Sequence, residues 1–263
     1  MIGSRARPPG DFDAADEYSD WDFQVITERP DWFANANWLK AAGLPAPEAY
    51  VFRSGRLGQA AKASMVFATG EMDVVIISAA RLRRAKLLSA FGVLAWMPGA
   101  SDALASLAVV LRPGYRLLKG ADRWGPFFRL VVNLYPPRPL SNTEICALAD
   151  GFVVDYISAL RKIQRGELLA AQRWLHHYLA DTNFRLLVAL EERRGRRALP
   201  DARRLERAVA KSWLAAVKVS DSGERASLPD AIERSAQGLR ALMRELVGEE
   251  WKWPELTLRL RAE

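Results

Sequence analysis

The sequence has one cysteine, Cys146, and two histidines among its 263 residues. A lone cysteine excludes an internal disulfide, and so few soft ligands exclude a structural zinc site. A long apolar run is also missing, because the stretch 87–111 is interrupted by Pro98 and Asp102, which favours two buried helices over a membrane span. No apolar signal segment follows Met1. We therefore expect a cytoplasmic protein that does not enter the membrane.

The composition is that of a folded protein. Apolar residues make up 50% of the chain and charged residues 26%, and 263 residues suffice for one large core or two ordinary domains. The net charge is +7, but residues 1–78 carry 11 acidic and 7 basic side chains, a net −4, which leaves +11 for the remainder. The two halves of the chain therefore differ electrically.

The front half combines strands and short helices. Strands are predicted at 22–27, 63–69, 72–77, 115–118 and 127–134 from their β-branched and aromatic residues, and helices at 32–42 and 81–96. Pro136, Pro137 and Pro139 interrupt the pattern. We place a domain boundary there and expect a mixed sheet with flanking helices over residues 1–139.

The back half has a helical period. Helices are predicted at 144–164, 167–193, 201–219 and 229–246. Ser141 and Glu144 have the spacing of a capping box for the first of them. Residues 140–263 are therefore expected to form a helical bundle, and the fold class is α+β.

Three aspartates in the front half suggest a cation site. Asp20 and Asp22 are two residues apart at the start of a predicted strand, so their side chains point the same way, and Asp73 opens another strand. Carboxylate oxygens are the ligands that Mg²⁺ prefers, and Mg²⁺ completes its octahedron with phosphate oxygens. This pattern suits phosphoryl or nucleotidyl transfer.

A small residue and a hydroxyl precede these aspartates. Gly3 allows close approach of the backbone, and Ser4 can donate a hydrogen bond to a phosphate oxygen beside Arg5 and Arg7. The combination of Gly-Ser, Asp-x-Asp and a third acidic residue on a later strand resembles the nucleotidyltransferases of the DNA polymerase β superfamily.

The resemblance is closer to the streptomycin 6-adenylyltransferase family of aminoglycoside-modifying enzymes. The segments that carry it are GSRARPPGDFDAADEYSDWDFQVIT at 3–27, MVFATGEMDVVIIS at 65–78, GYRLLK at 114–119 and RGELLAAQRWL at 165–175. The family implies a nucleotidyltransferase domain followed by a helical domain, with ATP as donor, Mg²⁺ as cofactor and a hydroxyl of a small molecule, an aminoglycoside, as the acceptor of AMP.

The resemblance also assigns roles in the front half. Ser4 corresponds to the phosphate-holding serine, with Gly3 and Arg5 beside it. Asp20 and Asp22 correspond to the two metal ligands. Asp73 corresponds to the third carboxylate, which either binds metal or helps to deprotonate the acceptor.

In such families a helix of the second domain often supplies a basic residue to the triphosphate and sometimes a carboxylate base. Arg161 or Lys162 is the candidate for the first role, and Asp155 for the second. Asp155 and Lys162 are seven residues apart and are expected on one helix face.

The sequence departs from the family pattern in three ways. The chain begins two residues before Gly-Ser, so the first strand is nearly absent and the natural start is expected upstream. The loop between Ser4 and Asp20 is long and acidic, and it either lines the acceptor site or is a solvated loop. The helical half is rich in arginine, whereas a polycationic aminoglycoside needs an acidic pocket.

The arginines keep two alternatives open. One is nucleotidyl transfer to a protein or an RNA, as in toxin–antitoxin systems, and the other is a degenerate module that binds nucleotide or RNA. The clustered carboxylates argue against the degenerate module, because a binding module has no need for carboxylates that repel one another. A nucleic-acid partner is the less favoured expectation but stays open. Two further expectations concern single residues: Trp21 should belong to the core, and His176 and His177 should serve packing or surface.

Overall fold

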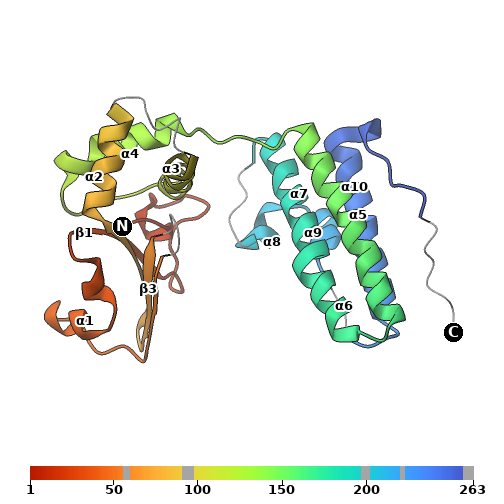
Figure 1. Ribbon diagram of the computed structural model, residues 1–263, viewed down its shortest axis with the longest axis horizontal. Helices are drawn as coiled ribbons and strands as arrows, with labels where there is room; N and C mark the ends of the chain where they lie inside the picture. Colours follow the sequence, from red (N-terminus) through yellow and green to blue (C-terminus); the bar gives the residue numbers. More distant parts are fainter. Residues whose placement is uncertain (56–59, 91–97, 197–201, 220–222, 257–263) are drawn as a thin grey trace. The chain divides into compact units, whose positions relative to one another are not determined.

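The computed structural model describes residues 1–55, 60–90, 98–196, 202–219 and 223–256. They divide into two compact units, Met1–Pro137 and Arg138–Glu263 (Figure 1). The strands that the structure describes all lie in the first unit, and the second is helical. The predicted α+β class, a mixed sheet with flanking helices followed by a helical region, is confirmed.

The first unit is built on a four-stranded sheet in the order β1-β4-β3-β2. The strands are β1 (Trp21–Thr27), β2 (Ala49–Arg53), β3 (Ala61–Phe67) and β4 (Gly70–Ser78). β1 is parallel to β4, whereas β3 is antiparallel to both β4 and β2. The strands predicted at 63–69 and 72–77 are β3 and β4, which form a hairpin, and β2 is a strand that the sequence analysis missed.

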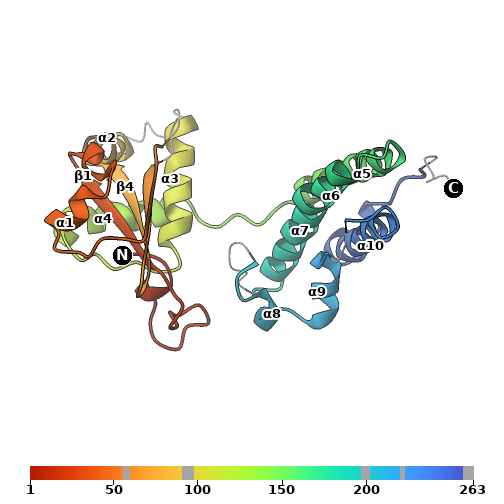
Figure 2. The ribbon, with the colours of Figure 1, turned by 90° about the horizontal axis from the view of Figure 1, so that it is seen from below.

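The two faces of the sheet are covered by different helices. On one face Val74 and Ile76 pack against Phe33 of η2 (Pro30–Phe33) and Trp38 of α1 (Asn37–Ala41). The predicted helix 32–42 is therefore broken into two short pieces. Figure 2 shows α1 and α3 on opposite sides of the sheet.

The other face carries apolar residues at one end. There Ile26 and Ile77 pack under α2 (Ala79–Ala90), α3 (Pro98–Leu111) and α4 (Ala121–Leu134). The helix predicted at 81–96 is present as α2 over its described part, and residues 91–96 of that prediction lie outside the described residues. Pro98 begins α3.

The strand predicted at 127–134 is wrong, because these residues belong to α4. The buried residues Trp124, Phe127, Phe128 and Val131 recur at the spacing of a helix, so burial of one helical stripe outweighs their strand propensity. Residues 115–118 are also not a strand. Arg116 nevertheless exchanges two backbone hydrogen bonds of 2.9 Å with Met1.

The described helices of the second unit pack around one core. They are α5 (Asn142–Gln164), α6 (Leu168–Trp174), η4 (Leu175–Leu179), α7 (Ala180–Arg193), α8 (Leu205–Ala208), α9 (Lys211–Val217) and α10 (Leu228–Val247). In Figure 1, α5, α7 and α10 run alongside one another. η4 is a single wide π-helical turn that joins α6 to α7 without a break. Short 3-10 turns occur at η1 (Ser4–Ala6) and η6 (Gly248–Glu250).

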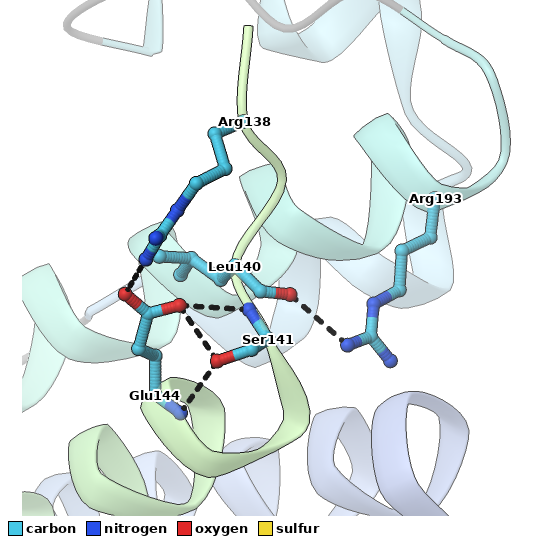
Figure 3. A network of polar contacts seen from close by, with 5 residues as sticks. All are labelled: Arg138, Leu140, Ser141, Glu144 and Arg193. Carbon is cyan, nitrogen blue, oxygen red and sulfur yellow. Dashed lines mark hydrogen bonds and ion pairs between the residues drawn. The ribbon is translucent and has the colours of Figure 1, made fainter.

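The first turn of α5 has the predicted capping box. Glu144 N–H donates to Ser141 Oγ at 3.3 Å, and Ser141 N–H donates to a Glu144 carboxylate oxygen at 2.9 Å (Figure 3). These bonds hold the pKa of Glu144 below its ordinary value, with Ser141 as the main cause. Two arginines contact the segment that leads into this helix: Arg138 pairs with the Glu144 carboxylate, and Arg193 donates a hydrogen bond to the Leu140 carbonyl. The cap therefore fixes where the bundle begins.

Asn183 is a buried polar residue in the core of the bundle. The side-chain amide of Asn183 donates to the Ala216 carbonyl at 3.1 Å and to the Ser235 carbonyl at 2.8 Å. Gly238 lets α10 lie close to α9, since a Cβ there would be 2.4 Å from the Ala216 carbonyl oxygen. The described helices include none that is both long enough and apolar enough to cross a membrane.

Candidate active site

Three aspartates of the first unit come together at one end of the sheet. Asp22 of β1 and Asp73 of β4 are register partners on parallel strands, so their side chains leave the same face. Asp20 lies one residue before β1 begins, so it is not on the same strand as Asp22, and its carboxylate joins the other two. One carboxylate oxygen from each residue lies within 4.8 Å of the other two. All three residues are half-buried, so a solvent-borne cation can reach them.

The sheet face explains why these carboxylates stay open. Along β1 the side chains on this face run from Asp22 through Gln24 to Ile26, and only the apolar end packs beneath helices. On β4 the same face runs from Asp73 through Val75 to Ile77. The apolar end anchors the strands, and the polar end presents the carboxylates.

Gly3 packs directly against one of the carboxylates. Its φ is +72°, and a Cβ on this residue would lie 2.1 Å from Asp22 Oδ2. Ile2 donates a backbone hydrogen bond of 3.0 Å to the Asp22 carbonyl, which holds the two segments together. Glycine is therefore needed here for its backbone conformation and for the space beside Asp22.

Ser4, next in the chain, is a buried hydroxyl group. It is 3% exposed, and its Oγ has no hydrogen-bond partner in the described part of the chain. A buried polar atom without a partner costs about 1–3 kcal/mol. A phosphate oxygen that accepted this hydrogen bond would remove the cost.

Arg5 is turned toward the loop that precedes β1. Its guanidinium donates to the Ser19 carbonyl at 2.6 Å and to the Asp20 carbonyl at 3.1 Å. The same group stacks on the Trp21 ring, 4.3 Å from the ring centroid. Arg5 therefore holds the backbone of Asp20 in place. Trp21 is 45% exposed, so the expectation that it belongs to the core is wrong.

The long loop between Ser4 and Asp20 uses part of its acidic charge internally. Asp13 is fully buried in an ion pair with Arg7. Asp11 accepts a hydrogen bond from the Asp13 N–H at 2.8 Å, and Asp16 accepts one from the Ser19 hydroxyl at 2.8 Å. These contacts give the loop a fixed shape of its own.

A lysine that the sequence analysis missed lies beside the carboxylates. Lys62 on β3 is ion-paired with Asp73, with 2.5 Å between Nζ and Oδ2. Asp73 is the register partner of Ser64, two residues from Lys62, so all three side chains share one sheet face. The pairing register is the signal that places Lys62 here, and it is not visible in the sequence.

The remaining candidates lie on α5 in the second unit. Asp155 accepts a hydrogen bond from Trp174 Nε1 at 3.1 Å, and the Lys162 ammonium lies 4.4 Å from the centroid of the same ring. Lys162 also pairs with Glu167 at 3.7 Å. Arg161 is exposed. Asp155 and Lys162 therefore share Trp174 on one helix face, and the roles of all three toward a nucleotide stay predictions. His176 and His177 are exposed in η4.

The arrangement in the first unit suits Mg²⁺. All of its ligand atoms are carboxylate oxygens, and Mg²⁺–oxygen distances of about 2.1 Å place neighbouring ligands roughly 3 Å apart and opposite ligands roughly 4.2 Å apart. The three carboxylates, each with an oxygen within 4.8 Å of the other two, would draw together around such an ion. Asp20, Asp22 and Asp73 are the residues that would hold the ion, with Ser4 close by in the chain for a phosphate oxygen.

Comparisons with known proteins give matches among solved structures. No protein-family model matches the sequence, and no curated protein matches it significantly. An aminoglycoside 6-adenyltransferase from Bacillus subtilis matches at 12% identity with a TM-score of 0.40, over 89% of this chain and 83% of that one. A nucleotidyltransferase-like protein from Exiguobacterium sibiricum 255-15 matches at 14% identity with a TM-score of 0.35, over 87% of this chain and 64% of that one.

Proposed function

We propose that this protein is a cytoplasmic, Mg²⁺-dependent nucleotidyltransferase that moves AMP from ATP to a hydroxyl group of a small molecule, an aminoglycoside such as streptomycin. The observation that carries the proposal is the convergence of Asp20, Asp22 and Asp73 within 4.8 Å. Three carboxylates this close repel one another, and a sheet has no structural reason to gather them. A bound dication would offset this repulsion.

The reaction is an in-line displacement at the α-phosphorus of ATP. The acceptor oxygen forms a bond to phosphorus, the bond to the β-phosphate oxygen breaks, and pyrophosphate leaves. Asp20 and Asp22 would hold Mg²⁺, which would supply positive charge for the phosphate oxygens. Asp73 orients the acceptor hydroxyl and takes its proton, unless it serves as a metal ligand and Asp155 is the base.

The chain's own groups position the nucleotide. In this proposal the buried Ser4 hydroxyl donates to a phosphate oxygen, and Gly3 lets the backbone approach. Arg5 acts indirectly by holding the backbone of Asp20. Arg161 or Lys162 of α5 supplies positive charge to the triphosphate. Catalysis of this kind rests on positioning and electrostatics.

The arginines of the second unit favour a small-molecule acceptor over RNA. Arg193 donates to the carbonyls of Leu246 and Leu140, and Arg194 pairs with Glu191 and Glu245. Arg196 also pairs with Glu191, which is buried. These contacts hold the three guanidinium groups within the bundle, which leaves them less free to bind the phosphates of an anionic polymer.

Transfer of label from ATP tests the proposal. The full chain is incubated with Mg²⁺ and ATP labelled at the α-phosphate, together with a panel of aminoglycosides, and in separate tubes with RNA or with cell protein. We expect one or more aminoglycosides to gain labelled AMP, and Asp22→Asn to abolish the transfer. Asp31→Asn is the matched control, since Asp31 is an exposed aspartate of the same unit. Label on RNA or protein alone would move the proposal to a macromolecular acceptor, and transfer that survives Asp22→Asn would contradict it.

A further inference from the structure

Lys62 brings a positive charge to a face of the sheet that is otherwise acidic at this end. Its side chain lies diagonally across the β3–β4 pair from Asp73 and forms the 2.5 Å contact with Oδ2. The oxygens of Asp20, Asp22 and Asp73 that could hold an ion lie within 4.8 Å of one another. A cation at that point and the Lys62 ammonium would therefore compete for the same carboxylate.

The ion pair is accessible and weak enough to open. The Lys62 side chain is 40% exposed and that of Asp73 is 23% exposed. Ion pairs at such partly exposed positions contribute at most about a fivefold preference for the paired state. A dication that meets three carboxylates at once can therefore displace the ammonium from Asp73.

The net charge of the metal-bound site suggests a phosphate oxygen of the nucleotide as the second partner of the displaced ammonium. Three carboxylates and one Mg²⁺ leave one net negative charge, which would oppose the binding of a polyanionic triphosphate. The charge of Lys62 brings this sum to zero, and the flexible lysine side chain can move its ammonium to a neighbouring oxygen.

Building on the proposed function, we infer that Lys62 is a positioning residue that exchanges partners during nucleotide binding. Without metal, its ammonium holds Asp73 and offsets the repulsion among the carboxylates. When the metal and ATP bind together, Asp73 turns to its role at the site and the ammonium moves onto a phosphate oxygen. Lys62 thereby lowers the affinity for a bare cation and raises the affinity for the nucleotide.

The inference predicts opposite changes in two binding constants. Binding of Mn²⁺ alone to the full chain is followed by electron paramagnetic resonance of the free ion, and binding of ATP in saturating Mg²⁺ by calorimetry. We expect Lys62→Gln to tighten Mn²⁺ about fivefold and to weaken ATP about fivefold, since a neighbouring charge changes such equilibria by this order. Lys62→Arg keeps the charge and should stay within about twofold of the wild type in both assays.

Controls separate the inference from the proposal on which it rests. Lys40→Gln removes the same charge from an exposed position on α1, on the opposite side of the sheet, and should change neither constant. Thermal melts show that each variant is folded. A wild type that binds neither Mn²⁺ nor ATP would refute the proposed function itself. A wild type that binds both, with Lys62→Gln unchanged or shifted in the same direction in the two assays, would overturn the role of Lys62 alone.

Discussion

Replacing Gly3 by alanine would place a methyl group on the carboxylate of Asp22. The backbone of Gly3 has φ +72° and ψ −164°, a region open almost only to glycine, and other residues lose about 1–3 kcal/mol there. The added Cβ would also lie 2.1 Å from Asp22 Oδ2, so the carboxylate must turn away. The substitution therefore acts on stability and on the cation site together.

The two effects have different sizes and different assays. The backbone cost should lower the melting temperature of the first unit by roughly 2–4 °C for each kcal/mol. Displacing a group that orients a metal ligand typically costs about 10–100-fold in metal affinity, which Mn²⁺ titration measures. Gly10→Ala is the matched control, because Gly10 has φ +87° but nothing within 4 Å of its Cβ position. It should lose stability and keep the affinity for Mn²⁺. A Gly3→Ala variant that is folded and binds Mn²⁺ as the wild type does would refute the reasoning.

Three further substitutions test other parts of the structure. Asp22→Asn should abolish transfer of AMP but leave the metal-free melting temperature unchanged or slightly raised, because it relieves repulsion among the carboxylates. A melting temperature that falls together with the activity would mean that Asp22 is structural. Gly238→Ala should destabilise the bundle by about 2 kcal/mol or more in denaturant titration, because its Cβ would lie 2.4 Å from the Ala216 carbonyl oxygen. Gly151→Ala is the control: the space around Gly151 in α5 is open, so this substitution should stabilise the bundle by about 0.5–1 kcal/mol. Hydrogen bonds from Ser141 hold the pKa of Glu144 below 4.5, so this carboxylate stabilises the bundle above about pH 4.5. The stabilisation is lost as the pH falls through the lowered pKa. Glu144→Gln should therefore flatten the fall in melting temperature on acidification, and an unchanged profile would contradict this account.

The strands β1, β3 and β4 could be predicted because each is a short run rich in apolar and β-branched residues. The two-residue alternation along a strand also put Asp20 and Asp22 on the same side, whereas strand pairing sets the register that brings Asp73 beside Asp22. α4 could not be found in this way, since Phe127 and Val131 favour strands by propensity. Their burial at helical spacing, with Trp124 one turn earlier, is decided by packing.

The parts of the site that escaped prediction depend on contacts between distant segments. Lys62 meets Asp73 only through the register of two strands, and Arg5 holds Asp20 only because the loop folds back over η1. Trp21 likewise stacks against Arg5 on the outside of the sheet, where its ring stays 45% exposed. No local pattern contains these relations, because each is set by tertiary pairing.

The single π-helical turn at η4 has a consequence for how the length of this chain can vary. Buried residues follow one another every four positions along α6, η4 and α7, at Ala171, Leu175, Leu179, Asn183 and Leu187. In an ordinary α-helix each such step drifts by about 40°, and the wide turn absorbs part of that drift. Deleting one residue within η4 would rotate α7 by about 100° relative to α6 and carry Leu186 and Leu190 away from the core. Insertions and deletions should therefore be tolerated in the loops of the bundle but not in this helix, where the extra residue sets the phase of everything that follows.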